Sequence, residues 1–204
     1  MSIPNLKDNA LFRQQCFIDG AWLNADGKNT IDVTNPATGA VIGTVPKTGT
    51  IETRRAIEAA NKAQPLWRAK TAGERARILR RWFDLILANQ EDLAVLMTTE
   101  QGKPLAEARG EIAYAASFIE WFAEEGKRVY GDTIPAPRVD ARVVVVKEPI
   151  GVCVAITPWN FPASNWKECT GSARPSPRFS TSRPITWIAT MDSKTTSPQS
   201  EGFS

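Results

Sequence analysis

The 204-residue chain contains no histidine at all. Without an imidazole it cannot supply a histidine general base, a Ser-His or Cys-His nucleophile pair, or a histidine-ligated metal from its own residues. Cysteine is also scarce, because Cys16, Cys153 and Cys169 lie far apart and form neither a Cys-x-x-Cys pair nor a metal-ligand spacing. We therefore expect free thiols in a reducing compartment and no bound metal.

Excess charge of one sign and long apolar runs are absent too. The net charge is +3 and the basic residues do not gather in one cluster, so the sequence does not favour nucleic acid as a partner. No apolar run has the length of a membrane span, and the first residues lack the apolar core of a secretion signal. With 42% hydrophobic and 23% charged residues, we expect a globular protein of the cytoplasm.

The start of the chain alternates short β-type runs with turn sequences. Asp19-Gly20 separates two such runs within residues 16–23, which predicts a hairpin. The turn sequence at residues 35–39 lies between a run at 31–33 and another at 41–46. We expect residues 1–46 to form a small antiparallel β layer.

Residues 51–126 have the apolar periodicity of helices. Thr71 and Glu74 have the spacing of a capping box, which predicts that a helix begins there. Pro65 should stop or bend the helix before it. The four expected helices cover residues 51–64, 71–86, 92–100 and 104–126, and a loop is expected at 130–135.

Two apolar runs follow, at residues 142–147 and 151–157. Apolar residues in succession are typical of strands that are covered on both faces, so we expect both runs to be buried, with Cys153 in the core. A buried strand that leads into a helix favours an α/β fold with a parallel sheet, of which residues 151–157 would be the first strand. From Ser164 onward the chain is rich in Ser, Thr and Pro without apolar periodicity, which is typical of extended or disordered polypeptide.

The second run leads directly into the sequence Thr-Pro-Trp-Asn-Phe-Pro at residues 157–162. Its two prolines restrict the backbone and therefore hold the amide side chain of Asn160 in a fixed position. Taken alone, an asparagine in a proline-flanked turn most often only helps to form the turn.

Several motifs together resemble the NAD(P)-dependent aldehyde dehydrogenases. They are Ile18-Asp19-Gly20-Ala21-Trp22, Asn35-Pro36-Ala37-Thr38-Gly39, Glu100-Gln101-Gly102-Lys103-Pro104, Pro149-Ile150-Gly151-Val152 and Thr157-Pro158-Trp159-Asn160-Phe161-Pro162. Residues 118–128 and 130–135 narrow the resemblance to the succinate-semialdehyde dehydrogenase branch. It covers roughly residues 10–163 and implies part of a cofactor-binding domain over residues 1–163, with a small β layer, helices and the first strands of a Rossmann-like parallel sheet. Residues 164–204 would be a low-complexity tail outside the family pattern.

The resemblance implies an enzyme that oxidises an aldehyde with NAD or NADP, here succinate semialdehyde to succinate. In the family a cysteine thiolate attacks the aldehyde, and a fixed amide N–H stabilises the negative charge that develops on oxygen. The match assigns that amide to Asn160. It places Ile156, Thr157, Pro158 and Trp159 at the strand end that lies along the cofactor. The family also implies a homo-oligomer.

The chain departs from the family pattern after the turn. Glu168 and Cys169 stand where the family has an Arg-Lys pair, and no Lys-Pro ribose-binding segment is recognisable in residues 171–204. No cysteine, Cys169 included, has the Gly-Gln context of the family's nucleophile. A second interpretation therefore stays open, in which the chain is a non-catalytic, truncated or frameshifted fragment that docks onto full-length subunits. The choice between NAD and NADP stays open as well.

Charged residues on the predicted helices invite a catalytic or binding role, but a simpler one is favoured. Glu120, Glu124 and Glu125 are expected on a solvated helix face rather than as acid or base groups. Lys103 and the pair Lys127-Arg128 are expected to be surface charges rather than an anion-binding patch.

Overall fold

The structure is a computed structural model that describes residues 5–157, Asn160 and residues 185–187. After a short 3-10 helix, η1 (Asn9–Leu11), the chain forms a hairpin from β1 (Cys16–Ile18) and β2 (Ala21–Leu23), which pair antiparallel. The turn residues Asp19 and Gly20 have φ values of 51° and 77°. Two successive left-handed residues are typical of the type I′ turn that Asp-Gly favours, which confirms the predicted hairpin.

A second hairpin consists of β3 (Thr30–Thr34) and β4 (Val41–Pro46), with a register shift between Val33 and Thr34. In its turn the side chain of Asn35 accepts a hydrogen bond from the Ala37 N–H at 2.9 Å. The antiparallel character of residues 1–46 is confirmed, although the strands form two separate two-stranded sheets rather than one layer.

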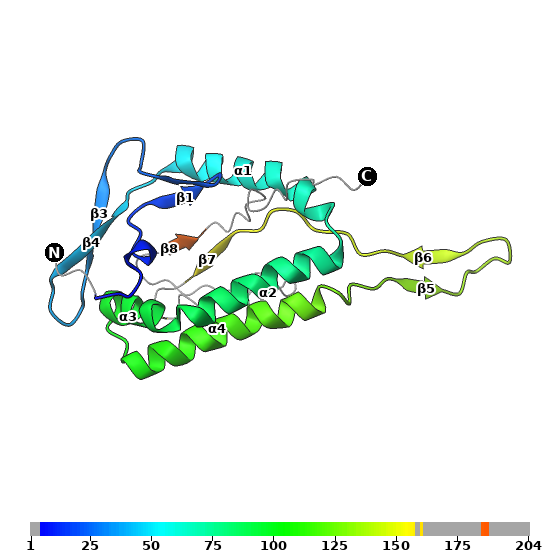
Figure 1. Cartoon of the computed structure of the whole chain (residues 1–204). Coiled ribbons are helices and arrows are strands. Elements are labelled where there is room, and N and C mark those ends of the chain that lie inside the picture. The colour runs from blue at the N-terminus through cyan, green and yellow to red at the C-terminus, as the bar shows by residue number, and fades with distance from the viewer. Residues whose placement is uncertain (1–4, 158–159, 161–184, 188–204) are drawn as a thin grey trace, which may run out of the picture.

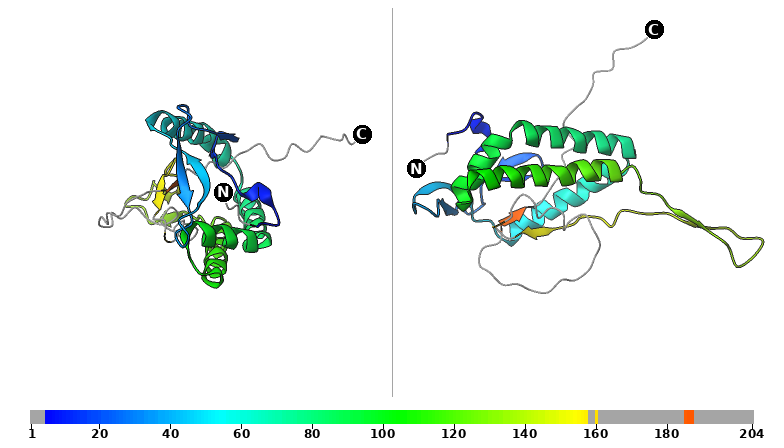
Figure 2. Two further views of the ribbon diagram at one scale, coloured as in Figure 1. Left: turned by 90° about the vertical axis from the view of Figure 1, so that its left-hand side faces the viewer. Right: turned by 90° about the horizontal axis from the view of Figure 1, so that it is seen from below.

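Four helices follow and make up most of the described chain. They are α1 (Thr50–Arg68), α2 (Ala72–Ala88), α3 (Gln90–Gln101) and α4 (Leu105–Glu125). The capping box at the start of α2 is confirmed, because the Glu74 N–H donates to Thr71 Oγ1 at 3.3 Å and the Thr71 N–H donates back to Glu74 Oε2 at 2.7 Å. Figures 1 and 2 show α2 and α4 side by side, with α1 apart from them.

Helix α1 extends beyond its predicted C-terminal end. It does not stop at Pro65, because the carbonyl of Pro65 still accepts the Ala69 N–H at 3.0 Å and the helix reaches Arg68. At its start the apolar Ile51 is 69% exposed, while the charged Glu52 is only 6% exposed. Glu52 turns inward because its carboxylate accepts the N–H groups of Asp26 and Gly49, both at 2.9 Å.

The core lies where α3 meets α4. Two of its four buried members are alanines, which lets the helices approach closely there. The buried members are Ala94, Met97, Ala108 and Ile112, with Ile86, Leu93 and Leu105 partly buried against them. Since Ile86 belongs to α2, this cluster joins the three helices into one packed unit.

Beyond α4 the chain forms a long hairpin that extends away from the helices (Figure 1). Its strands, β5 (Asp132–Ile134) and β6 (Val143–Val145), pair antiparallel. The loop predicted at residues 130–135 is therefore wrong, and so is the burial predicted for 142–147, because Val144 is 65% exposed. Valine favours a strand by its β-branched shape, so a run of valines predicts the strand without fixing what covers it.

The last described strands are β7 (Ala155–Thr157) and β8 (Ile185–Trp187), which pair antiparallel. The prediction of a buried strand with parallel neighbours is wrong here, since Ile156 is 69% exposed and Cys153 is exposed too. Every strand pair among the described residues is antiparallel. The predicted tail lies outside the described residues apart from β8, and no helix in the described ranges has the length and apolarity to cross a membrane.

Candidate functional site around Asn160

Asn160 lies just after β7, and its main chain has one partner from a distant part of the sequence. Its carbonyl oxygen accepts a hydrogen bond from Lys103 Nζ at 3.1 Å. Ile156 and Thr157 belong to β7, whereas Pro158 and Trp159 lie outside the described residues. The assignment of Asn160 as an oxyanion donor, and of residues 156–159 to the cofactor, therefore stays a prediction.

Lys103 is not the surface charge that its sequence position predicts. Its side chain is only 12% exposed, and its ammonium forms an ion pair with the carboxylate of Glu111, whose side chain is 4% exposed. Lys103 lies in the connection between α3 and α4, while Glu111 lies in the second turn of α4. The sequence alone does not indicate that Glu111 pairs with Lys103, because the pairing depends on how the chain turns between α3 and α4.

Gly102 ends α3 in a left-handed conformation with φ of 78°, and its N–H donates to the Thr98 carbonyl at 2.8 Å. A Cβ at this position would lie 2.8 Å from Cγ of Pro36, so the turn between β3 and β4 packs directly on the glycine. Gly102 thus ends helix α3 as its C-cap, and its lack of a side chain leaves room for the ring of Pro36 to pack against it.

Three sequence motifs that are far apart in the chain therefore meet at one place. Pro36, from the motif at residues 35–39, packs against Gly102 in the motif at residues 100–104. Lys103 of that same motif donates a hydrogen bond to Asn160, in the motif at residues 157–162. The prediction singled out all three motifs, but nothing in their spacing indicated that they touch.

The other charged groups on α4 lie on a solvated face, as predicted. Glu124 and Glu125 pair with Lys127 and Arg128 at 2.9 and 2.7 Å, and all four side chains are well exposed. The side chain of Lys127 holds the pKa of the Glu124 carboxyl below its ordinary value. Exposed pairs of this kind contribute little to stability, about 0–1 kcal/mol.

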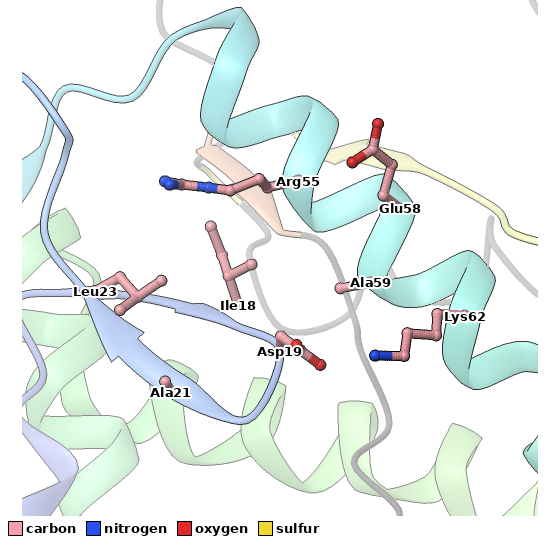
Figure 3. A pocket seen from close by; sticks show the side chains of 8 residues that line it. All are labelled: Ile18, Asp19, Ala21, Leu23, Arg55, Glu58, Ala59 and Lys62. Carbon is pink, nitrogen blue, oxygen red and sulfur yellow. The ribbon is translucent and has the colours of Figure 1, made fainter.

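A separate hollow of about 440 Å³ lies between the β1–β2 hairpin and α1 (Figure 3). It is lined by Ile18, Asp19, Ala21, Leu23, Arg55, Glu58, Ala59 and Lys62. Its charges are of both signs, and Arg55 is already paired with Asp26 at 2.8 Å. No cluster of Cys, Asp or Glu within the described ranges could hold a metal ion. The group around Asn160 therefore remains the stronger candidate.

Comparison with known proteins gives a consistent picture. Residues 22–171 match the model of the aldehyde dehydrogenase family. A glutarate-semialdehyde dehydrogenase of Pseudomonas putida is 73% identical over 159 residues, which are 78% of this chain and 33% of that protein. A succinate-semialdehyde dehydrogenase [NADP(+)] of Escherichia coli is 67% identical over the same shares of the two chains.

Solved structures agree with these relatives. The crystal structure of a succinate-semialdehyde dehydrogenase from Burkholderia pseudomallei superposes with a TM-score of 0.77 at 68% identity, over 78% of this chain and 33% of that one. A crystal structure described as an NADP dependent enzyme of E. coli gives a TM-score of 0.78 at 66% identity, over 79% and 34%. The α/β fold class is thereby confirmed, and the chain spans about a third of the length of the relatives it matches.

Proposed function

The chain belongs to the aldehyde dehydrogenase family, and we propose that it contributes the oxyanion-binding side of a site that oxidises an aldehyde with NAD or NADP. The observation that carries the proposal is the anchored main chain of Asn160, whose carbonyl is bound by a lysine that is itself mostly buried. A side-chain amide on such a support matches the need for a donor that is already in place when charge develops on the aldehyde oxygen.

For the substrate we propose an aldehyde that carries a carboxylate, with succinate semialdehyde as the first choice. Support comes from the names of relatives at 73% and 67% identity, which act on glutarate and succinate semialdehyde. Glutarate semialdehyde is therefore the natural comparison substrate.

For the cofactor we propose NAD or NADP along residues 156–159, where the exposed side chain of Ile156 offers an accessible apolar surface at the carboxyl end of β7. When bound, the nicotinamide would accept the hydride. The role of this chain is to orient the cofactor and the aldehyde. The end of β7 supplies the surface for the cofactor, and the side-chain amide of Asn160 donates an N–H to the aldehyde oxygen.

The nucleophilic thiolate and the glutamate that activates water have no counterpart at this site among the described residues. Cys153 is exposed and lies two residues before β7, and Cys16 lies in β1. We therefore propose that the 204 residues by themselves do not oxidise aldehydes. A homo-oligomer in the cytoplasm is part of the same proposal.

A second candidate role is docking onto longer subunits of the same family. It is favoured by the hairpin β5–β6, where Val144 of β6 and Val146 directly after this strand are 65% and 69% exposed. In this role the chain would bind without catalysing.

A chimera tests the main proposal. Residues 10–163 would replace the matching segment of the P. putida relative, and oxidation of succinate and glutarate semialdehyde would be followed with NAD and NADP. We expect an active chimera in which N160A lowers kcat by about 10²–10³-fold. The matched control is N61A, on an exposed position of α1. A folded chimera in which N160A and N61A have the same kcat would refute the role of Asn160.

A further inference from the structure

Lys103 connects the helical part of the molecule to the turn that carries Asn160. Its ammonium forms the ion pair with Glu111 and also donates to the carbonyl oxygen of Asn160 at 3.1 Å, across 57 positions of sequence.

The burial of this lysine indicates that its direction is determined by protein contacts. The side chains of Lys103 and Glu111 are 12% and 4% exposed. A charge withdrawn from water needs protein partners for its donors, and an ammonium has three N–H donors to place. By contrast, the side chains of Lys127 and Glu124 are each 47% exposed, so water can replace that pair.

The backbone on both sides of Lys103 is restrained as well. Gly102 is held left-handed with Pro36 packed against it, and Pro104 follows directly. A residue before proline has a reduced range of backbone angles. The ammonium of Lys103 is therefore presented from a stiff segment and aimed by Glu111.

We propose that Lys103 is a positioning residue for Asn160. By holding the carbonyl of Asn160 it fixes the peptide plane that follows this residue, and with it the direction in which the side-chain amide leaves the backbone. An oxyanion donor is effective only when it is aimed before the charge develops. Lys103 itself acts through Asn160, and the proposal rests on the proposed function of Asn160.

The carbonyl of Asn160 can be observed separately from all others in this chain. Asn160-Phe161 is the only Asn-Phe pair in the sequence, so labelling Asn with ¹³C at the carbonyl and Phe with ¹⁵N leaves one HNCO signal. We expect K103M to shift that carbonyl signal upfield, because the carbonyl loses a charge-assisted hydrogen bond. K103R, which keeps cationic donors, should recover part of the shift. The matched control is K127M, which removes an exposed ion pair on the same helical unit and should leave the signal unchanged.

A folded K103M chain with the wild-type carbonyl signal would overturn the proposal. If K103M loses its helical circular dichroism, E111Q decides instead: it must move the Asn160 signal further than K127M does, and an E111Q signal at the wild-type position refutes the proposal. The measurement needs no aldehyde and no cofactor. A failure of Lys103 to position Asn160 is therefore distinguishable from an inactive chimera, which would count against the proposed function alone.

Discussion

Replacing Gly102 with alanine should destabilise the protein strongly, although the change adds a single methyl group. Gly102 has φ of 78°, a conformation that L-residues adopt only with strain. The new Cβ would also lie 2.8 Å from Cγ of Pro36, which belongs to a rigid ring rather than to the end of a flexible side chain.

The two effects can be given separate magnitudes. The left-handed conformation costs about 1–2 kcal/mol for a residue with a Cβ. Overpacking against a fixed neighbour costs about 1–3 kcal/mol. The free energy of unfolding should therefore fall by about 2–5 kcal/mol, and the melting temperature should fall by at least about 4 °C in a chain of this size.

Urea unfolding followed by far-ultraviolet circular dichroism measures this loss. The matched control is G110A, in the interior of α4, where a Cβ would meet no atom within 4 Å. There alanine should stabilise the helix by about 0.5–1 kcal/mol, so the two Gly→Ala changes should have opposite signs. The P36A background separates the two costs, because removing the ring should leave only the conformational part of the G102A effect.

Two results would refute this reasoning. If G102A and G110A shift the urea midpoint in the same direction, the left-handed conformation of Gly102 does not control stability. If G102A costs the same with and without Pro36, the turn between β3 and β4 does not pack on the glycine.

Two further predictions concern the capping groups. T71A should lower the free energy of unfolding by about 1 kcal/mol because the Glu74 N–H loses its acceptor, whereas T71S should keep the wild-type urea midpoint; equal midpoints for both variants would contradict the cap. The N–H groups of Asp26 and Gly49 hold the pKa of the Glu52 carboxyl below its ordinary value of 4.5, so its contribution to stability is present above that pH and is lost as the pH falls through the lower, folded-state value. The urea midpoint of E52Q should therefore fall less steeply on acidification than that of the wild type, and parallel curves would show that Glu52 plays no part.

Features that depend on a few neighbouring residues could be predicted from the sequence. The Asp19-Gly20 turn and the capping box at Thr71 are both confirmed, because each is decided by the backbone preferences and hydrogen bonds of adjacent residues. Pro65 does not stop the helix, and the alternative that it bends the helix stays a prediction. Proline lacks an N–H to donate within the helix, and this loss matters less near the end of α1. The carbonyl of Pro65 still accepts a hydrogen bond from the Ala69 N–H.

Burial could not be predicted in the same way. The two apolar runs, at residues 142–147 and 151–157, do contain the strands β6 and β7. However, Val144 in the first run and Cys153 in the second are exposed. A continuous apolar run indicates a surface that needs covering without identifying the element that covers it. For the opposite reason Lys103 was expected at the surface, because a lysine is buried only where a specific partner meets it, and Glu111 and Asn160 meet it through the fold rather than through local sequence.

The contacts of Lys103 also explain how a motif without any reacting group can matter to a site. Its segment touches the turn at Pro36 through Gly102 and holds the main chain of Asn160 through the lysine ammonium. Each contact alone is weak, since one hydrogen bond contributes about 0.5–1.5 kcal/mol, or somewhat more when it is charged. For the donor role that we propose for Asn160, the value of these contacts lies in direction, because a donor that is already aimed loses little freedom when charge develops beside it. In this proposal the Gly-Lys-Pro segment is the support for the main chain of Asn160.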